Sequence, residues 1–353
     1  MTGQTIAAGA VQLSGIVFAP LLVGAVQWVK ARAQGRRGAS PLQPYRELRR
    51  LWRRSGVRPQ PSTVVYDLAV PVSAAATLLA LLVLPVANSS PDWGLGHDAL
   101  VLFALLAIGR FALAAAAWDT ASGFELMGAA RELTFAVFVE ALLLVVLALL
   151  AFPAHSTDLL AMRDAAASGD AWREPAQWAA AIGLALVILA ETGRRPIDNP
   201  DTHLELTMVH EGPTLEYAGR DLALLHWSAA ARTWVVLVLA AEILVPHPGS
   251  PAVQFLWLAG WISAFAVLLA VAESVQPKMR LLRVPVLLYG GAVIAMLGLA
   301  SRLLGSPHER AVRDRGHRDR SCDRHRPPPH RRRRARRCAV GGARGVRTGP
   351  RVR

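Results

Sequence analysis

The chain has 353 residues, of which 53% are hydrophobic, and its mean hydropathy is positive at +0.33. This composition argues against two soluble domains and is typical of a polytopic membrane protein. The formal net charge of +14 would suggest nucleic-acid binding, but His308 to Arg353 holds 17 arginines against four acids, which leaves only +1 on the rest of the chain.

The first apolar run, Ile6–Val29, is long enough to cross a bilayer. No Lys or Arg precedes it, and it is long for a signal peptide, so we expect a retained first span. Lys30–Pro59 follows with ten basic residues and a single acid, Glu47, and should therefore remain on the cytoplasmic side. Apolar residues at helical spacing predict a short amphipathic helix over Pro44–Arg54, lying at the membrane interface.

Seven further apolar runs bring the predicted number of membrane spans to eight. They are Val64–Val86, Ala99–Trp118, Leu133–Phe152, Gln177–Ala190, Ala230–Val245, Val253–Ala272 and Val284–Leu304. The sequence thus predicts an all-α, polytopic integral membrane protein. Lys and Arg concentrate in alternate loops, which places the charged loop between the fifth and sixth spans on the cytoplasmic side. We expect the chain to lie in the cell (plasma) membrane.

The chain is expected to divide into a membrane domain, residues 1–307, and an Arg-rich tail, residues 308–353. The tail has runs of proline and arginine and no apolar periodicity, which is typical of disorder. With eight spans it falls on the outer side, so we expect no nucleic-acid partner. We interpret it as an out-of-frame translation of a GC-rich gene end.

Several ionisable residues fall inside or at the ends of the predicted spans. Arg110, Glu140 and Glu242 lie within spans, and Asp67, Glu191 and Glu273 lie near span ends. Charges in the bilayer core are costly, so these side chains are expected to face the interior of the bundle. They could form structural ion pairs or a path of protonatable carboxylates, and their repetition in several spans favours the path.

The loop Glu191–Trp227 concentrates carboxylates, histidines and arginines. Asn199–Pro200–Asp201 predicts a helix start, and Gly212–Pro213 predicts its end. Asp201 and Glu205 share one face and call for a cation, for which Arg194 and Arg195 are near in sequence. A zinc site at His203, His210 and Glu211 is the rival interpretation, but the spacing does not match HExxH.

The body of the chain contains no cysteine, because Cys322 and Cys338 both lie in the tail. Cysteine-ligated iron–sulfur clusters are thereby excluded from residues 1–307. We expect this chain to bind no cofactor of its own.

Four separated segments carry a family resemblance. They are GRRGASPLQPYRELRRLWRR in the first loop, Gly109–Glu132, ETGRRPIDNPDTHLELTMVHE with LEYAGRDLALLHW, and ESVQPKMRLLRVP at Glu273–Pro285. Together they resemble the complex I subunit 1 family, which includes a membrane subunit of NADH–quinone oxidoreductase, over roughly residues 10–305. The resemblance is closer to the branch of formate hydrogenlyase subunit 4 and the membrane-bound nickel–iron hydrogenases of hydrogenase-4 type.

The resemblance implies a membrane subunit that anchors a soluble redox arm and couples electron transfer to proton translocation. Its implied partners are hydrogenase-like large and small soluble subunits, which carry the nickel–iron centre and iron–sulfur clusters, and antiporter-like membrane subunits in the lipid bilayer. The implied coupling residues are Glu191, Arg194, Arg195, Asp198, Asp201, Glu205, Glu211, Glu216, Glu140, Glu242, Glu273 and Asp67, with Arg110 and Arg131 balancing their charge. The quinone-site subunit of an NADH–quinone oxidoreductase and a lone secondary transporter are the alternatives.

Overall fold

The computed structural model describes residues 3–60, 62–86, 96–166, 171–198, 209–245, 251–277, 279–280 and 283–324, with side chains placed for all of these except 3–10, 251–252 and 305–324. The chain divides into two units, Met1–Arg302 and Leu303–Arg353. Within the described ranges the regular elements are helical, as the composition predicts.

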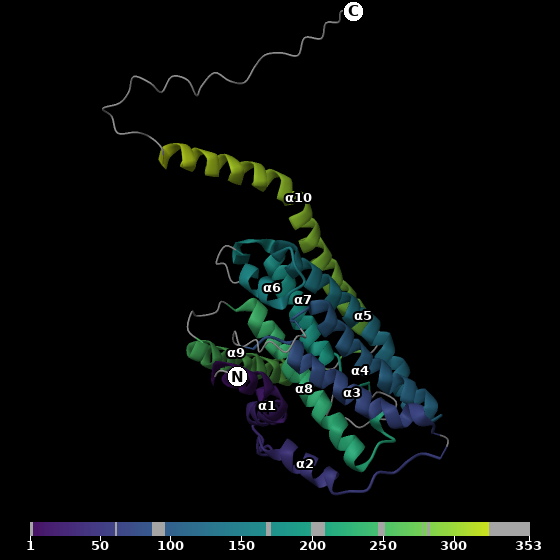
Figure 1. Cartoon of the computed structure of the whole chain (residues 1–353). Coiled ribbons are helices and arrows are strands. Elements are labelled where there is room, and N and C mark those ends of the chain that lie inside the picture. The colour runs from purple at the N-terminus through teal and green to yellow at the C-terminus, as the bar shows by residue number, and fades with distance from the viewer. Residues whose placement is uncertain are drawn as a thin grey trace, which may run out of the picture. The chain divides into compact units, whose positions relative to one another are not determined.

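The elements follow one another in chain order (Figure 1). They are α1 (Gly3–Ala33), α2 (Gln43–Trp52), α3 (Val64–Val83), α4 (Ala99–Asp119), α5 (Gly123–Ala154), α6 (Leu159–Ala166), η1 (Ala171–Arg173), α7 (Pro175–Glu191), η2 (Gly212–Thr214), α8 (Gly219–Leu244), α9 (Pro251–Val275) and α10 (Val284–Arg324). The elements η1 and η2 are short 3₁₀ helices.

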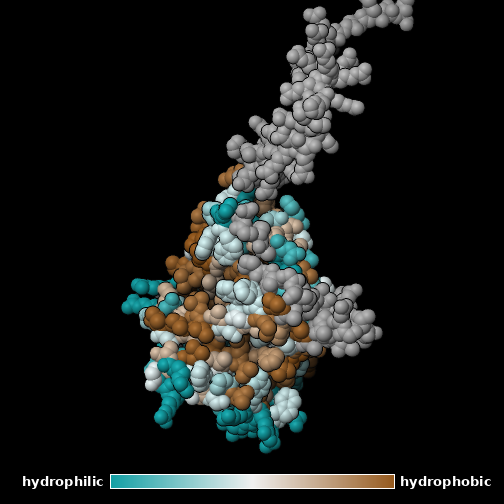
Figure 2. Space-filling model, turned by 90° about the vertical axis from the view of Figure 1, so that its left-hand side faces the viewer, coloured by the Kyte–Doolittle hydropathy of each residue, from teal (hydrophilic) through white to brown (hydrophobic). Residues whose placement is uncertain are grey.

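Seven of these helices are long and apolar enough to span a membrane, which confirms the prediction of an all-α polytopic membrane protein. The one remaining predicted span, the fifth in chain order, corresponds to α7, an apolar helix of 17 residues. At 1.5 Å per residue it is about 25 Å long, slightly less than a hydrocarbon core of about 30 Å. On the face shown in Figure 2, apolar side chains form a broad band and polar side chains gather below it.

Helix α8 is the centre of the first unit. It contacts α1, α2, α3, α6, α7 and α9, and Figure 1 shows it between α1 and α9 on one side and α3, α4 and α5 on the other. Every residue from Val235 to Ile243 is buried, and all but Glu242 are apolar, so this part of α8 is enclosed by other helices on all sides. Any polar group that α8 carries within the bundle therefore needs a partner on a neighbouring helix.

Two helices begin earlier than hydropathy predicts. Helix α5 starts at Gly123 rather than Leu133, and α8 starts at Gly219 rather than Ala230. In α5, Glu125 and Glu132 resemble loop sequence yet are buried, whereas Arg220 and Asp221 in the first turn of α8 are exposed. Gly219 has φ +60°, and a Cβ there would lie 2.7 Å from the carbonyl oxygens of Arg54 and Ser55, so the start of α8 needs glycine.

The predicted amphipathic helix at Pro44–Arg54 is confirmed as α2, which runs over Gln43–Trp52. Pro44 lies in its first turn, where the missing N–H costs nothing. The Tyr45 hydroxyl donates to the carbonyl of Val17, and Leu51 is buried, so α2 lies against α1 and α8.

The helix predicted between Asn199 and Gly212 lies almost wholly outside the described residues. Its last residues, Val209–Glu211, form bends, and Gly212–Thr214 forms η2, so the predicted helical end there is wrong. Backbone N–H groups of Val209 and His210 bond to Asp198 instead of to a preceding turn, at 3.3 and 3.5 Å. The Asp198 carboxylate thus accepts the N–H groups that backbone carbonyls would accept in a helix.

The second unit begins as a continuation of α10, which is helical to Arg324. The sequence instead predicted disorder from His308. Glu309 and Asp314 each precede an arginine by four residues, a spacing that favours helix. Whether residues 308–353 are an out-of-frame translation remains a prediction.

Candidate functional site

Arg110 of α4 is the centre of a buried ion-pair cluster. Its Nη2 lies 2.6 Å from Glu191 Oε1, its Nη1 lies 2.9 Å from Glu140 Oε1, and its Nε lies 3.7 Å from Glu132 Oε1. Three carboxylates from α5 and α7 therefore share one guanidinium whose side chain is 5% exposed. The planar fork of arginine offers five donors, so it can hold several acceptors at once.

Arg232 of α8 completes this cluster. It lies close enough to Arg110, Glu191, Glu132 and Glu140 for electrostatic interaction. Gly109 makes room for it, because a Cβ on that residue would lie 3.0 Å from Arg232 Nη2. We call Arg110, Glu132, Glu140, Glu191 and Arg232 the Arg110 cluster; it holds three carboxylates and two guanidiniums.

Glu132 and Arg232 were not predicted as site residues from the sequence. The predicted fourth span began at Leu133, one residue after Glu132, so this acid was assigned to a loop. The signal was present in the spacing, since Glu132 and Glu140 are eight residues apart and share one face of α5. Arg232 interrupts an apolar run and could have been recognised as an intramembrane charge.

A second buried cluster ties the start of the Glu191–Trp227 loop to two other helices. Glu273, at the end of α9, has a fully buried side chain that accepts from Lys30 Nζ at 2.6 Å and from Arg194 Nη1 at 3.0 Å. We call Lys30, Arg194 and Glu273 the Glu273 clamp. Lys30 lies in the last turn of α1, and the sequence analysis had assigned it only to the basic loop.

The loop itself is held through Asp198 and His210. The Asp198 carboxylate lies 3.7 Å from His210 Nδ1. Burial alone lowers the pKa of His210, but the carboxylates of Asp198 and Glu132 outweigh it, so the pKa is raised above its ordinary value of 6.5. His210 therefore connects the loop electrostatically to the Arg110 cluster. Asp201 and Glu205 lie outside the described residues, as does His203 of the zinc alternative.

The end of the loop contacts α3 and α5. Glu216 Oε1 accepts a hydrogen bond from Ser122 at 2.7 Å, and its backbone carbonyl accepts from the Tyr66 hydroxyl at 3.0 Å. Tyr66 and Tyr217 stack with ring centroids 4.4 Å apart. Glu211 is partly buried beside η2.

Other predicted site residues lie apart from these clusters. Asp67 pairs with Arg58 at 3.0 Å on the surface, where both side chains are about half exposed. Glu242 lies 3.6 Å from Arg163 of α6, and both are buried. Ten residues separate Glu242 from Arg232 along α8, a rise of about 15 Å. Arg131 and Arg195 are both partly buried.

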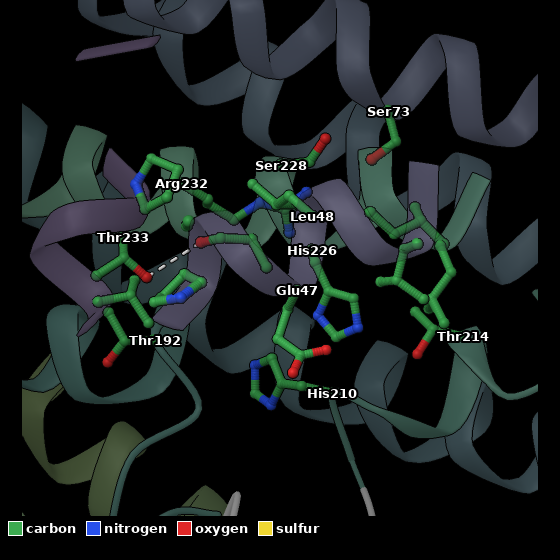
Figure 3. Close-up of a pocket in the computed structure, with 18 of the residues that line it drawn as sticks. Glu47, Leu48, Ser73, Thr192, His210, Thr214, His226, Ser228, Arg232 and Thr233 are labelled. Atoms are coloured by element: carbon green, nitrogen blue, oxygen red, sulfur yellow. Dashed lines mark hydrogen bonds between the residues drawn. The ribbon is translucent and has the colours of Figure 1, made fainter. Parts of the chain in front are cut away.

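A cavity of about 480 Å³ opens between α1, α2 and α8. Glu132, Glu191 and Arg232 of the Arg110 cluster line it, and Arg194 of the Glu273 clamp reaches it as well. Figure 3 shows His210, Glu47 and His226 along its wall. The cavity therefore joins the two clusters to the loop.

The arrangement matches a known family of membrane proteins. Residues 6–301 match the family model described as NADH dehydrogenase. The chain belongs to the NADH dehydrogenase family. The resemblance to complex I subunit 1 that the loop residues indicated is thereby confirmed.

Relatives from Escherichia coli (strain K12) agree with the hydrogenase branch. The chain is 32% identical to hydrogenase-4 component C over 234 residues, covering 65% of this chain and 72% of the relative. It is 34% identical to formate hydrogenlyase subunit 4 over 234 residues, covering 65% and 73%. NADH-ubiquinone oxidoreductase chain 1 of Thymallus arcticus is 28% identical over 243 residues, covering 68% and 73%.

The fold also matches a solved structure. A chain of the membrane-bound sulfane sulfur reductase, an archaeal respiratory membrane complex, superposes with a TM-score of 0.71 at 19% identity, covering 84% of this chain and 98% of that chain. At this identity the likeness shows the fold. The relatives belong to membrane-bound respiratory complexes, so partner subunits and a lipid bilayer surround proteins of this kind.

Proposed function

We propose that this chain is the membrane subunit of a hydrogenase or formate hydrogenlyase complex, where it anchors the soluble redox arm and couples electron transfer to proton translocation. The names of the two Escherichia coli relatives support the type of complex. The Arg110 cluster carries the coupling role, because it places more carboxylates than guanidiniums inside the bundle.

The coupling role follows from charge balance. Buried Glu132 and Glu191 and partly buried Glu140 face two guanidiniums, which leaves one negative charge unmatched within the cluster. An uncompensated buried charge is costly. A proton on one carboxylate removes that cost, and any shift of a neighbouring charge moves the proton's preferred place. His210 supplies such a neighbour from the loop, which links loop position to proton position.

The proposed assembly follows the same logic. The Glu191–Trp227 loop, on the cytoplasmic side of the plasma membrane, would dock hydrogenase-like large and small subunits that hold the nickel–iron centre and iron–sulfur clusters. Antiporter-like membrane subunits would flank the bundle. The excess of Lys and Arg in the first loop supports this orientation. Electron chemistry belongs to the soluble subunits and proton movement to this chain.

Glu140→Gln tests the proposal in the intact complex. The amide keeps the size of the side chain and a contact to Arg110 but cannot carry a proton in the same way, so the complex should assemble and lose proton translocation in membrane vesicles. Glu174→Gln, a half-exposed carboxylate paired with Arg302, is the matched control and should translocate normally. Normal translocation by Glu140→Gln would contradict the proposal.

The quinone-site role is the second candidate function, and the cavity favours it. Its lining combines apolar side chains such as Val23, Leu48 and Leu113 with the donors His226 and Arg232, the mixture that a quinone head group requires. A bound quinone would accept electrons from a partner protein of the complex, while His226 and Arg232 would hold its oxygens.

A photoreactive quinone analogue distinguishes the two candidates. Inhibition of the complex with labelling of α2 or α8, weakened by His226→Ala, supports the quinone function. Labelling confined to other subunits contradicts it and leaves proton coupling by the Arg110 cluster intact.

A further inference from the structure

Glu125, which no sequence argument singled out, lies in the first turn of α5 and is completely buried. Its Oε2 lies 2.6 Å from the Thr120 hydroxyl, and its Oε1 has no hydrogen-bond partner. Among the residues that the structure describes, no Lys, Arg or His forms an ion pair with it. A buried carboxylate without a cation is rare and therefore calls for an explanation.

The usual structural explanation for an acid at this position does not apply. Ser122 is the N-cap of α5, and Ser122-Gly-Phe-Glu125 has the spacing of a capping box, in which serine and glutamate satisfy the free N–H groups of the first turn. Here the Ser122 side chain makes no cap bond and donates to Glu216 of the loop at 2.7 Å. Glu125 bonds to Thr120 instead.

The contacts of the Thr120 hydroxyl are consistent with a protonated Glu125. Its oxygen lies 3.1 Å from the carbonyl of Ala117 and 2.6 Å from Glu125. A hydroxyl has one proton to donate, and a carbonyl can only accept. Thr120 can therefore share its proton between the two acceptors, or it can donate to Ala117 and accept from a protonated Glu125. The second arrangement makes both contacts full hydrogen bonds.

The surroundings agree with a neutral acid. The groups close enough to interact electrostatically with Glu125 are Glu216, Tyr66 and Tyr217. Glu216 is a second acid, and burial raises the pKa of Tyr217, so that its phenol stays neutral. None of these neighbours supplies the positive charge that would hold Glu125 as a carboxylate.

Glu125 also occupies a position between the loop and the Arg110 cluster. Glu125, Glu132 and Glu140 are spaced by seven and eight residues, so they share one face of α5. Near Glu125, α5 presses directly on the loop, since a Cβ on Gly128 would lie 2.6 Å from the Cα of Gly212. These three acids therefore form a row along α5 that begins beside the loop and ends beside Arg110.

We propose that Glu125 is held as a neutral carboxylic acid and relays protons between Glu216 and Glu132. In each cycle one O–H bond breaks as a proton moves towards Glu132, and one forms as a proton arrives from the side of Glu216; no electrons move. The rise from Glu125 to Glu132 is about 10 Å, so the transfer includes water between them. This role rests on the proposed proton coupling.

Infrared spectroscopy of the purified complex tests the protonation state independently of turnover. The C=O stretch band of protonated carboxyl groups should lose one component in Glu125→Gln relative to the wild type and Glu174→Gln, while a proton on the Arg110 cluster keeps its own component in all three. An unchanged band in Glu125→Gln would overturn the proposal. If that variant does not assemble, Glu125→Asp should shift the band, because its hydrogen bond to Thr120 changes; an unshifted band would likewise overturn it.

Proton translocation in vesicles tests the relay. Loss in both Glu125→Gln and Glu140→Gln, with Glu174→Gln normal, is the expected result. Normal translocation by Glu125→Gln while Glu140→Gln fails would overturn the relay and leave the proposed function standing. A wild-type complex that moves no protons would overturn both, whereas the infrared band would still report a stored proton.

Discussion

The Arg110 cluster and the Glu273 clamp are built from the same residue types in opposite proportions. In the cluster three carboxylates share Arg110 and Arg232, whereas in the clamp the single carboxylate of Glu273 receives Lys30 and Arg194. A carboxylate that faces two cations is stabilised in its ionised form. Where carboxylates outnumber cations, protonation of one carboxylate is favourable because it removes an unmatched charge.

The two regions therefore have different expected tasks. The Glu273 clamp holds the start of the loop against α1 and α9, and its charges are fixed. The Arg110 cluster, with its excess of carboxylates, is proposed to take up and release a proton. Four predictions would break or sharpen this comparison.

Arg110→Met should have the largest effect. It leaves Glu132, Glu140 and Glu191 buried with Arg232 as the nearest remaining cation, at a cost of about 3–5 kcal/mol in the free energy of unfolding. Denaturant unfolding of the purified subunit measures this loss. Arg58→Met removes an exposed arginine and is the control; equal losses in the two variants would show that the cluster is not a buried network.

Glu273→Gln should have the second-largest effect, a loss of about 3 kcal/mol in the free energy of unfolding, because two buried cations lose their shared counter-charge. The loss should also free the start of the loop, so cleavage by trypsin after Arg194 should accelerate. If stability falls but cleavage there stays slow, the clamp does not hold the loop.

The contact between His210 and Asp198 should give a smaller, pH-dependent effect of about 0.5–1 kcal/mol. The pKa of His210 is raised in the folded chain, so its stabilising contribution is complete below the unfolded value of about 6.5 and is lost as pH rises through the folded value. The stability difference between wild type and His210→Gln should therefore be present at pH 5.5 and vanish in alkaline solution, about pH 9. A difference that grows with pH would contradict the assignment.

Asp67→Asn should have the smallest effect, within about 0.5 kcal/mol, because its pair with Arg58 is exposed. The same variant sharpens the assignment of the coupling residues. If Asp67→Asn loses proton translocation, Asp67 belongs to the coupling residues despite its exposure. Normal translocation would restrict the coupling residues to acids within the bundle.

The sequence anticipated much of the fold and part of the site. Hydropathy located the spans, and basic-residue counts and helical spacing predicted α2. Arg110, Glu140 and Glu191 were correctly expected to face the interior of the bundle, because a charge in a span has few other places to go. Hydropathy failed at the start of α5, where Glu125 and Glu132 are buried, and at the start of α8, where Arg220 and Asp221 lower the hydropathy of a helical segment.

The partners of the charges could not be predicted. Lys30 and Glu273 are 243 residues apart, and Arg110 and Glu191 are 81 apart. Glu125 and Glu132 were overlooked because they precede the apolar run of α5. Nothing in the local sequence shows that the loop at Gly212 presses against Gly128, between these two buried acids on α5.

By itself, the sequence determined that this chain crosses the membrane repeatedly, that no cysteine-ligated cluster lies in residues 1–307, and that its ionisable groups concentrate around one loop. These properties depend on composition and on short-range periodicity. Only the tertiary structure decided that three carboxylates share Arg110 while two cations share Glu273. The physical reason is that charge pairing in a bundle is set by which helix faces meet, and that depends on packing over the whole membrane unit rather than on any single segment.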